Sequence, residues 1–401
     1  MMTPEEIETL ARRAVTGMLS PLKKLQEEAE AGNTEAQYAL GNLYFVGKGV
    51  GLNLPLAAKW FLRSAQSGDP KAMTMLGNLY LAKNPVSGDE AKAFLWISNA
   101  ADKGYVEAMY RLGELYYLGI GVSEDHAKAY HWVERAALTG DATAECLLGS
   151  YLIGGIGCEK NIEKGLEYVK SAADNDVETA QRLLAIYYKS GEGVEQSHET
   201  AAIWLKRAAD NGDVASMYML YNLYLNGEGV EVNTKLADEY LKKAATAGLD
   251  KAQIELGRLY EMGERVTKNP RQAETWYMKA AEHDNSNAFL RLGVLYASNS
   301  PIKSYRKARK WLLKSMADLN HEAFFYLSVF YTHGWDGPQD NIMAYVLMFL
   351  SSLGYEPAEQ CLDGLFIKLT LPEMSAAQDL IRSSRQFPDQ FAMMVKAGLE
   401  G

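Results

Sequence analysis

Apolar residues recur along this chain with the spacing of one helix face, and the whole pattern then repeats. A small residue followed four positions later by Leu marks each copy, and an aromatic residue follows after eight in most copies. Spacing of i, i+4 and i+8 places side chains on one face of a helix. The small residues, most of them 36 apart, are Ala36, Ala72, Ala108, Ala144, Ala180, Ser216, Ala252, Ala288, Ala323 and Ala358. The pattern predicts one helix per copy at these positions.

A second helix is predicted in the remaining half of each copy. Leu-Gly pairs such as Leu76-Gly77 lie within the first helix, and Gly-x-Gly-Val strings such as 119–122 follow it. Glycines of this kind end a helix and turn the chain. The second helix then carries an aromatic residue in a fixed register, and Ala-Ala follows it. Those aromatic residues are Trp60, Trp96, Trp132, Tyr168, Trp204, Tyr240 and Trp276.

A single pair of such helices cannot bury its own apolar faces, and stacked pairs form a continuous core. We expect the large aromatic residues of the second helices to fill the space left by Gly and Ala on their neighbours. The Gly inside the first helix needs a packing reason, because Gly costs about 1 kcal/mol in a helix interior. Close approach of the next helix supplies that reason.

The repeat resembles the Sel1-like repeat, a relative of the tetratricopeptide repeat. The third copy is the most similar, with Ala108, Leu112-Gly113, Tyr116, Gly119, Gly121-Val122, Lys128-Ala129, Trp132, Ala136-Ala137 and Gly140. The resemblance covers roughly residues 21–356 and implies an all-α, right-handed solenoid of stacked antiparallel helix pairs. The Gly loop is replaced by other residues at 83–86 and at 299–301.

Three segments are expected: capping helices over 1–32, about nine repeats in one continuous solenoid over 33–356, and a helical cap over 357–401. A helix near residues 4–18 precedes a lone second helix at 21–31. After the repeats, amphipathic helices are predicted around 358–369, 372–384 and 388–396. The stretch from Thr370 to Glu373 has the form of a capping box.

Charge and cysteine content exclude several classes of protein. The chain has 401 residues and a formal net charge of −10, which argues against nucleic-acid binding. Its three cysteines, Cys146, Cys158 and Cys361, form no disulfide framework. No apolar run is long enough to span a membrane. The first residues show no secretory signal, so a cytoplasmic location is expected, or a periplasmic one if a signal has been removed.

No group of residues has a spacing that indicates catalysis, a metal or a cofactor. The six histidines lack zinc-ligand spacing, and the Gly-rich string at 154–157 is not followed by the Lys of a phosphate loop. We therefore expect a non-enzymatic protein without cofactor or metal. A basic run is interpreted as a solvated helix face, with an acidic partner or anionic lipid as the alternative. It comprises Lys303, Arg306, Lys307, Arg309, Lys310 and Lys314.

The resemblance implies that the first helices line a concave groove, and that positions two, six and nine after each small residue point into it. Asn there can hydrogen-bond a peptide backbone, and Tyr and Phe supply rigid contact area. The predicted groove residues are Tyr38, Asn42, Phe45, Asn78, Tyr110, Glu114, Tyr117, Tyr218 and Asn222. Phe325 and Trp335 are predicted as a second patch, within an aromatic cluster that is otherwise core.

These features favour a monomeric, bacterial-type scaffold or adaptor that grips a partner protein or peptide in the groove. A sharper alternative is an immunity or regulatory protein that wraps and inhibits a secreted effector. A structural spacer that oligomerises through the C-terminal patch is a third reading. A hydrolase of cell-wall fragments or β-lactams, proposed for some relatives of the family, is less favoured because no Ser, Cys or Lys has a readable partner.

Overall fold

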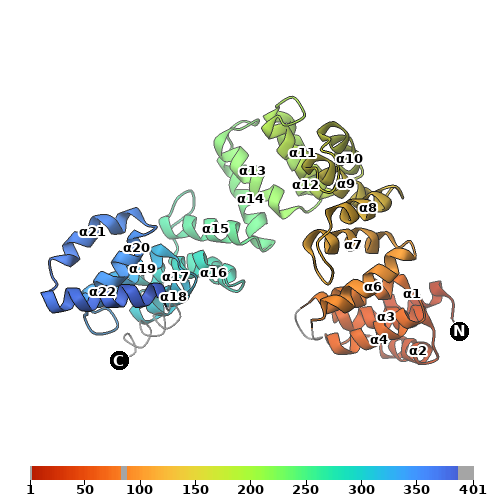
Figure 1. Cartoon of the computed structure of the whole chain (residues 1–401), viewed down its shortest axis with the longest axis horizontal. Helices are drawn as coiled ribbons and strands as arrows, with labels where there is room; N and C mark the ends of the chain where they lie inside the picture. Colours follow the sequence, from red (N-terminus) through yellow and green to blue (C-terminus); the bar gives the residue numbers. More distant parts are fainter. Residues whose placement is uncertain (1, 83–87, 387–401) are drawn as a thin grey trace. The chain divides into compact units, whose positions relative to one another are not determined.

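The computed structural model describes residues 2–82 and 88–386, and in these ranges every regular element is an α-helix, 22 in all (Figure 1). The chain divides into two compact units, Met1–Asp213 and Val214–Gly401. The predicted all-α repeat architecture is confirmed, whereas the extent of one continuous solenoid stays a prediction.

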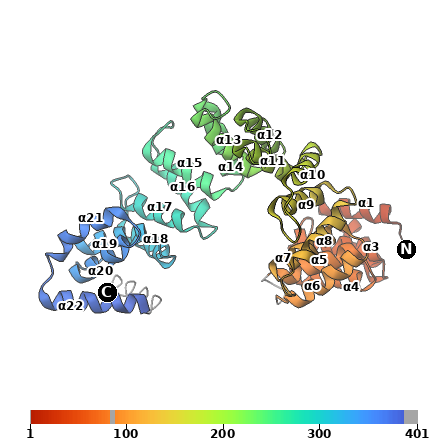
Figure 2. The ribbon, with the colours of Figure 1, turned by 45° about the horizontal axis from the view of Figure 1, so that its top comes forward.

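The first unit holds twelve helices. They are α1 (Pro4–Val15), α2 (Leu19–Glu30), α3 (Thr34–Val46), α4 (Leu54–Gln66), α5 (Pro70–Leu81), α6 (Glu90–Asp102), α7 (Val106–Leu118), α8 (His126–Ala137), α9 (Ala142–Gly154), α10 (Ile162–Asp174), α11 (Glu178–Ser190) and α12 (His198–Asp210). From α3 on, each odd-numbered helix packs on the even-numbered helix of its own repeat, which packs in turn on the next odd-numbered helix (Figure 2).

The second unit continues the same alternation. Its helices are α13 (Val214–Asn226), α14 (Thr234–Thr246), α15 (Asp250–Met262), α16 (Pro270–Ala281), α17 (Ser286–Ala297), α18 (Tyr305–Ala317), α19 (His321–His333), α20 (Asn341–Ser352), α21 (Glu356–Phe366) and α22 (Leu371–Gln386). Helices are present in both terminal segments as α1, α2, α21 and α22, while their role as caps stays a prediction. The predicted helix at 388–396 lies outside the described residues.

The second helix of each repeat begins at a polar N-cap that recurs with the repeat. In α8, the side chain of Asp125 accepts a hydrogen bond from the backbone N–H of Lys128, and its own N–H donates to the carbonyl of Tyr116. Such caps stabilise a helix start by satisfying donors that have no partner within the helix. The N-caps of this series are Asn53, Asp89, Asp125, Asn161, Ser197, Asn233, Asn269, Ser304 and Asp340.

The glycine inside the first helix allows the second helix to come close, as its position in the sequence predicts. A Cβ built on Gly77 would lie 2.5 Å from Cγ1 of Ile97 and 3.2 Å from the carbonyl oxygen of Ala93. The residue opposite the glycine is fully buried in six repeats, and it directly follows the aromatic register. These residues are Phe61, Ile97, Val133, Val169, Tyr277 and Leu312. The expectation that the Trp itself fills this space is wrong.

Most of the aromatic residues of the second helices instead lie at the margin of the core. Trp60 and Tyr240 are buried, whereas Trp96, Trp132, Trp204 and Trp276 are only half-buried. A cation three residues further along the helix lies over the ring in six repeats, within the range of cation–π attraction. The pairs are Arg63–Trp60, Arg135–Trp132, Arg207–Trp204, Lys243–Tyr240, Lys279–Trp276 and Lys314–Trp311.

The glycine loops have two tasks. Gly119 ends α7 in the left-handed region with φ of 66°. Gly121 packs against the preceding repeat, because a Cβ there would lie 2.1 Å from the carbonyl oxygen of Glu90. The loop of the second repeat lies largely outside the described residues. In the eighth repeat, α17 ends at Ser298 in an extended conformation rather than at a left-handed Gly, so the departure seen in the sequence is structural.

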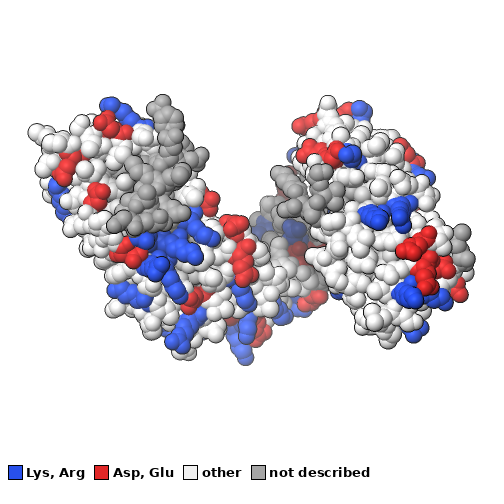
Figure 3. Space-filling view, turned by 90° about the horizontal axis from the view of Figure 1, so that it is seen from below, with Lys and Arg blue, Asp and Glu red and all other residues white. Residues whose placement is uncertain are grey.

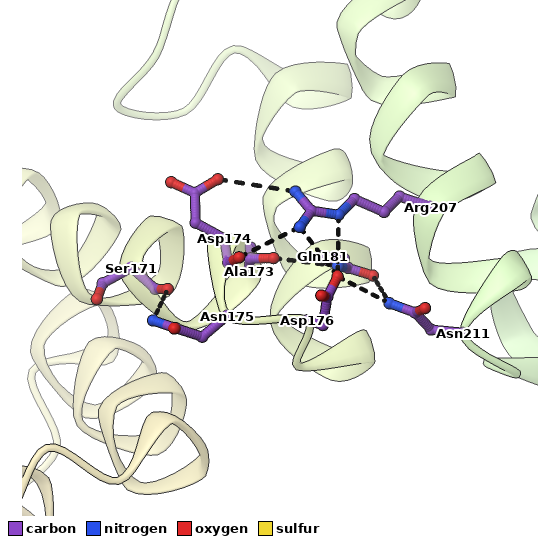
Figure 4. Close-up of polar contacts among 8 residues, drawn as sticks. All are labelled: Ser171, Ala173, Asp174, Asn175, Asp176, Gln181, Arg207 and Asn211. Atoms are coloured by element: carbon purple, nitrogen blue, oxygen red, sulfur yellow. Dashed lines mark hydrogen bonds and ion pairs between the residues drawn. The ribbon is translucent and has the colours of Figure 1, made fainter.

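Hydrogen bonds and an ion pair between polar side chains also connect α10, α11 and α12 (Figure 4). The buried Gln181 donates to the carbonyl of Ala173 at 3.0 Å and accepts a hydrogen bond from Asn211 at 3.1 Å. Arg207 and Asp176 form an ion pair at 2.9 Å. The hydrogen bond from Arg207 lowers the pKa of Asp176. These contacts join helices of two successive repeats.

Candidate functional site

The first unit has a hollow of about 870 Å³ where two of the predicted groove residues lie together. Tyr38 and Asn42 of α3 line one wall, and residues of α1 such as Ile7 and Ala11 line the facing wall. The turn from Ser67 to Lys71, which leads into α5, closes one side. The hollow therefore combines an amide, a phenol, apolar side chains and the N-terminal end of a helix.

Packing holds the aromatic residues of this site in place. The ring of Tyr38 lies 5.7 Å from that of Phe61, and the ring of Phe45 lies 6.5 Å from Phe61 on another side. Phe61 is the buried residue opposite Gly41. Asn42 is exposed. A rigid aromatic base beside a free amide suits peptide binding, because little side-chain entropy is lost on contact.

Carboxylates surround the tyrosines of this surface. Burial raises the pKa of Tyr38, and the charges of Asp69 and Glu107 raise it further. Burial and Glu107 also raise the pKa of Tyr105 and of Tyr110. The hydroxyl of Tyr105 donates to Glu107 at 3.1 Å. The charge of Glu107 thus contributes to the raised pKa of three tyrosines, Tyr38 on α3, Tyr105 at the N-cap of α7 and Tyr110 on α7.

The sequence pattern did not identify Asp69, Tyr105 or Glu107 as members of this surface. The residue at the register position of Tyr105 caps the first helix in some repeats, through Asn33, Asp69 and Asp141. In other repeats, at Tyr105, Val177 and Leu249, it makes no side-chain cap. The repeat register therefore carries no signal that singles out Tyr105.

The remaining predicted groove residues of the first unit differ in their exposure and in the contacts that they already make. Asn78 on α5 is half-buried. Glu114 on α7 forms an ion pair with Arg111 at 2.9 Å. Tyr117 is 38 % exposed and contacts the rings of Tyr151 and His126. The structure therefore brings Tyr38 and Asn42 into one hollow, with Tyr110 electrostatically linked through Glu107.

Two predicted groove residues belong to the second unit. Tyr218 and Asn222 lie on α13, one turn apart. The side-chain amide of Asn222 donates to the carbonyl of Tyr218 at 3.0 Å, and the ring of Tyr218 lies 5.6 Å from that of Tyr221. They form a local arrangement of their own within that unit.

The predicted second patch consists of two separate aromatic groups. Trp335 stacks on Tyr305 with ring centroids 4.6 Å apart, while Phe325 contacts Tyr326 and Tyr355, each at 5.4 Å. Phe325 lies within α19, whereas Trp335 lies beyond the end of that helix, after the left-handed Gly334. Both side chains are half-buried and pack against the core.

The groups capable of other chemistry are dispersed. Among the described residues, no three His, Cys, Asp or Glu side chains gather closely enough to hold a metal ion. Burial raises the pKa of Cys146 and of Cys158, and a raised pKa lowers the thiolate fraction that a nucleophile needs. In the part of the chain that the structure describes, no helix has the length and apolar character required to cross a membrane.

Comparison with known proteins places the chain in a family. The Sel1 repeat model matches nine segments, 34–69, 70–105, 106–141, 142–177, 179–213, 214–249, 250–285, 290–317 and 321–352. A Sel1 repeat protein from Oxalobacter formigenes is 30 % identical, with a TM-score of 0.54 over 79 % of this chain and 92 % of that one. A protective antigen of uropathogenic Escherichia coli with an SLR fold is 24 % identical, with a TM-score of 0.53 over 100 % and 97 % of the two chains. No curated protein sequence matches. The chain belongs to the Sel1 repeat family.

Proposed function

We propose that this protein is a non-catalytic scaffold that binds an extended segment of a partner protein on the first helices of its N-terminal unit. The observation that carries the proposal is the hollow lined by Tyr38 and Asn42, with α1 and the Ser67–Lys71 turn as its other walls. Its volume of about 870 Å³ falls within the range of natural ligand pockets. Sel1 repeat proteins generally act as protein-interaction scaffolds, which supports the same assignment.

The hollow is lined by three carboxylates, Glu8, Glu35 and Asp69, and by two cations, Arg12 and Lys71. This excess of one negative charge favours a segment that carries Lys or Arg. An ammonium or guanidinium group would gain both carboxylate attraction and a cation–π contact with a Tyr face. The exposed amide of Asn42 is free to hydrogen-bond the backbone of the same segment.

The test compares the proteins captured from native lysate by three baits, followed by affinity measurement with each purified candidate. The baits are the wild type, Tyr38→Ala/Asn42→Arg, and a control, Gln66→Ala/Asn99→Ala, on exposed positions of α4 and α6. We expect a directly binding partner to lose at least about tenfold in affinity for the groove variant, because a central aromatic anchor contributes about 2 kcal/mol or more. The control should retain full affinity.

Thermal unfolding of the three proteins separates binding from folding. Because Tyr38 packs on Phe61, the single variant Asn42→Arg provides a second test that leaves this contact intact. A partner that binds the wild type and both groove variants equally would overturn the assignment of this hollow. Turnover of a substrate by the purified chain would overturn the scaffold assignment itself.

A further inference from the structure

A second hollow lies in the other unit, and its lining is dominated by positive charge. It has a volume of about 1040 Å³ and is lined along α18 by Arg306, Lys307, Arg309, Lys310 and Lys314, and across from them by Asp336. Helix α18 has five cations and no carboxylate among its 13 residues, in a chain whose net charge is −10. In Figure 3, Lys and Arg side chains gather on the C-terminal unit.

Some of these cations interact with neighbouring residues, and others do not. Arg309 forms an ion pair with Asp336 at 3.3 Å and holds the loop between α19 and α20. Lys307 approaches Glu274 at 3.8 Å, and the amine of Lys314 lies over the rings of Phe289 and Trp311. Arg306 and Lys310 are exposed, and neither forms an ion pair with another described residue. They lie four residues apart, on one face of the helix.

We propose that this basic surface of α18 docks an acidic segment of a partner protein, rich in Asp and Glu. The cations from Arg306 to Lys314 extend over about 12 Å of helix. A single anion would meet only one or two of them, whereas about four residues of an extended chain cover that distance. The Arg side chain adds a planar donor set suited to carboxylates.

The form of the surface favours a peptide over a membrane or a nucleic acid. The cations line a hollow rather than a flat face, and among the described residues the apolar side chains that line it with them are those of Leu313 and Ala317. Helices that bind membranes insert large apolar side chains beside their cations. Nucleic acids engage longer basic surfaces, and the acidic net charge of the chain opposes them. An acidic peptide, in contrast, needs only the positive charge of α18 in order to bind.

The test titrates full-length protein against a fluorescein-labelled Glu-rich peptide of about twelve residues and follows its fluorescence anisotropy. We expect saturable binding that weakens as salt is added, because exposed charges are screened. Arg306→Glu/Lys310→Glu should weaken the binding by at least about tenfold through repulsion of the carboxylates. The matched control Lys235→Glu/Lys242→Glu makes the same charge change at exposed positions of α14 and should bind within about twofold of wild type.

Four further measurements address the source of the anion and the independence of the site. A Lys-rich peptide should not bind to this surface. Vesicles of phosphatidylcholine with phosphatidylserine, and a short DNA duplex, should bind more weakly than the Glu-rich peptide. The N-terminal variant Tyr38→Ala/Asn42→Arg should bind the Glu-rich peptide as the wild type does. Equal binding of the peptide by both charge-reversed proteins, or tighter binding of vesicles or DNA, would overturn the proposal.

Discussion

Ile97 occupies the space that the missing side chain of Gly77 leaves open. A Cβ on Gly77 would lie 2.5 Å from Cγ1 of Ile97, which is closer than any ordinary contact between carbon atoms. Equivalent pairs recur along the chain, with Gly113 against Val133 and Gly293 against Leu312. In these repeats the close stacking of the two helices therefore depends on one position without a side chain, whereas Ala185, Tyr221 and Ser328 stand at that position in three other repeats.

Gly77→Ala is expected to destabilise the protein by about 1–3 kcal/mol, because the overpacked pair α5–α6 must separate. The higher helix propensity of Ala offsets about 1 kcal/mol of this. Urea denaturation of the full chain measures the difference. Gly364→Ala is the control, since the space around Gly364 in α21 is open, and there the propensity gain should appear alone as slight stabilisation. Stabilisation by Gly77→Ala would contradict the close-packing account.

Asn161→Ala tests the recurring N-cap of the second helices. The side chain of Asn161 accepts a hydrogen bond from the backbone N–H of Lys164 at 3.0 Å, and Ala cannot replace that acceptor. We expect a loss of about 1 kcal/mol, measured by chemical denaturation. Asn161→Asp retains the acceptor and should be close to wild type. A cost for Asp equal to that for Ala would show that side-chain capping is not the cause.

The pair of His283 and Asp250 predicts a pH dependence in the second unit. Nδ1 of His283 lies 2.6 Å from the carboxylate of Asp250, and this hydrogen bond and charge raise the pKa of His283. A raised folded-state pKa means that the stabilisation is complete below the unfolded pKa of about 6.5. It is lost as the pH rises through the higher folded-state value.

Thermal melts of the wild type and His283→Gln at several pH values check this dependence. The wild type should melt at a higher temperature than the variant near pH 5.5, and the difference should shrink toward pH 8.5. Asn285 also donates to Asp250, so the carboxylate keeps a partner in the variant. His131→Gln, at an exposed position of α8, should show no such trend. A difference that grows with pH would contradict the assigned direction.

The repeat made most of the fold predictable, because its small, aromatic and glycine positions fix where each helix begins and ends. The packing partner of the glycine was assigned incorrectly. The pattern marks Trp96 as large and recurrent, yet only geometry shows that its neighbour Ile97 faces Gly77. Recurrence marks a position as constrained, and it does not tell whether the constraint is core volume or a surface contact with a cation.

Only part of the candidate site could be predicted from the sequence, because only part of it belongs to the repeat. Tyr38 and Asn42 follow from the repeat register, whereas α1 and the Ser67–Lys71 turn complete the hollow. The cap helix α1 has no counterpart in the repeat, so its side chains have no register from which to place them. Asn222 is the opposite case. The repeat register places it on a first helix, but its side-chain amide already donates a hydrogen bond within that helix.

Gln181→Met isolates a hydrogen bond between repeats at nearly constant side-chain volume. Gln181 is fully buried and its amide donates to the carbonyl of Ala173, which lies at the end of α10. Met cannot make these hydrogen bonds, so this carbonyl and the amide of Asn211 each lose one partner, while the carbonyl keeps the backbone N–H of Asp176 and the amide keeps the carboxylate of Asp176. Each hydrogen bond lost in this way costs about 0.5–1.5 kcal/mol. Gln37 and Gln253 make the same contact with Ala29 and Ala245.

The measurement for Gln181→Met is the free energy of unfolding in urea, with Gln66→Met at an exposed position of α4 as the control. Met73 and Met109 occupy the same register in other repeats, so the site accommodates a thioether sterically. A loss confined to Gln181→Met therefore reports the missing hydrogen bond rather than a clash. Equal stability of the variant and the wild type would mean that the hydrogen bonds of Gln181 drawn in Figure 4 contribute no net stability, and that packing and the Arg207–Asp176 ion pair join these repeats.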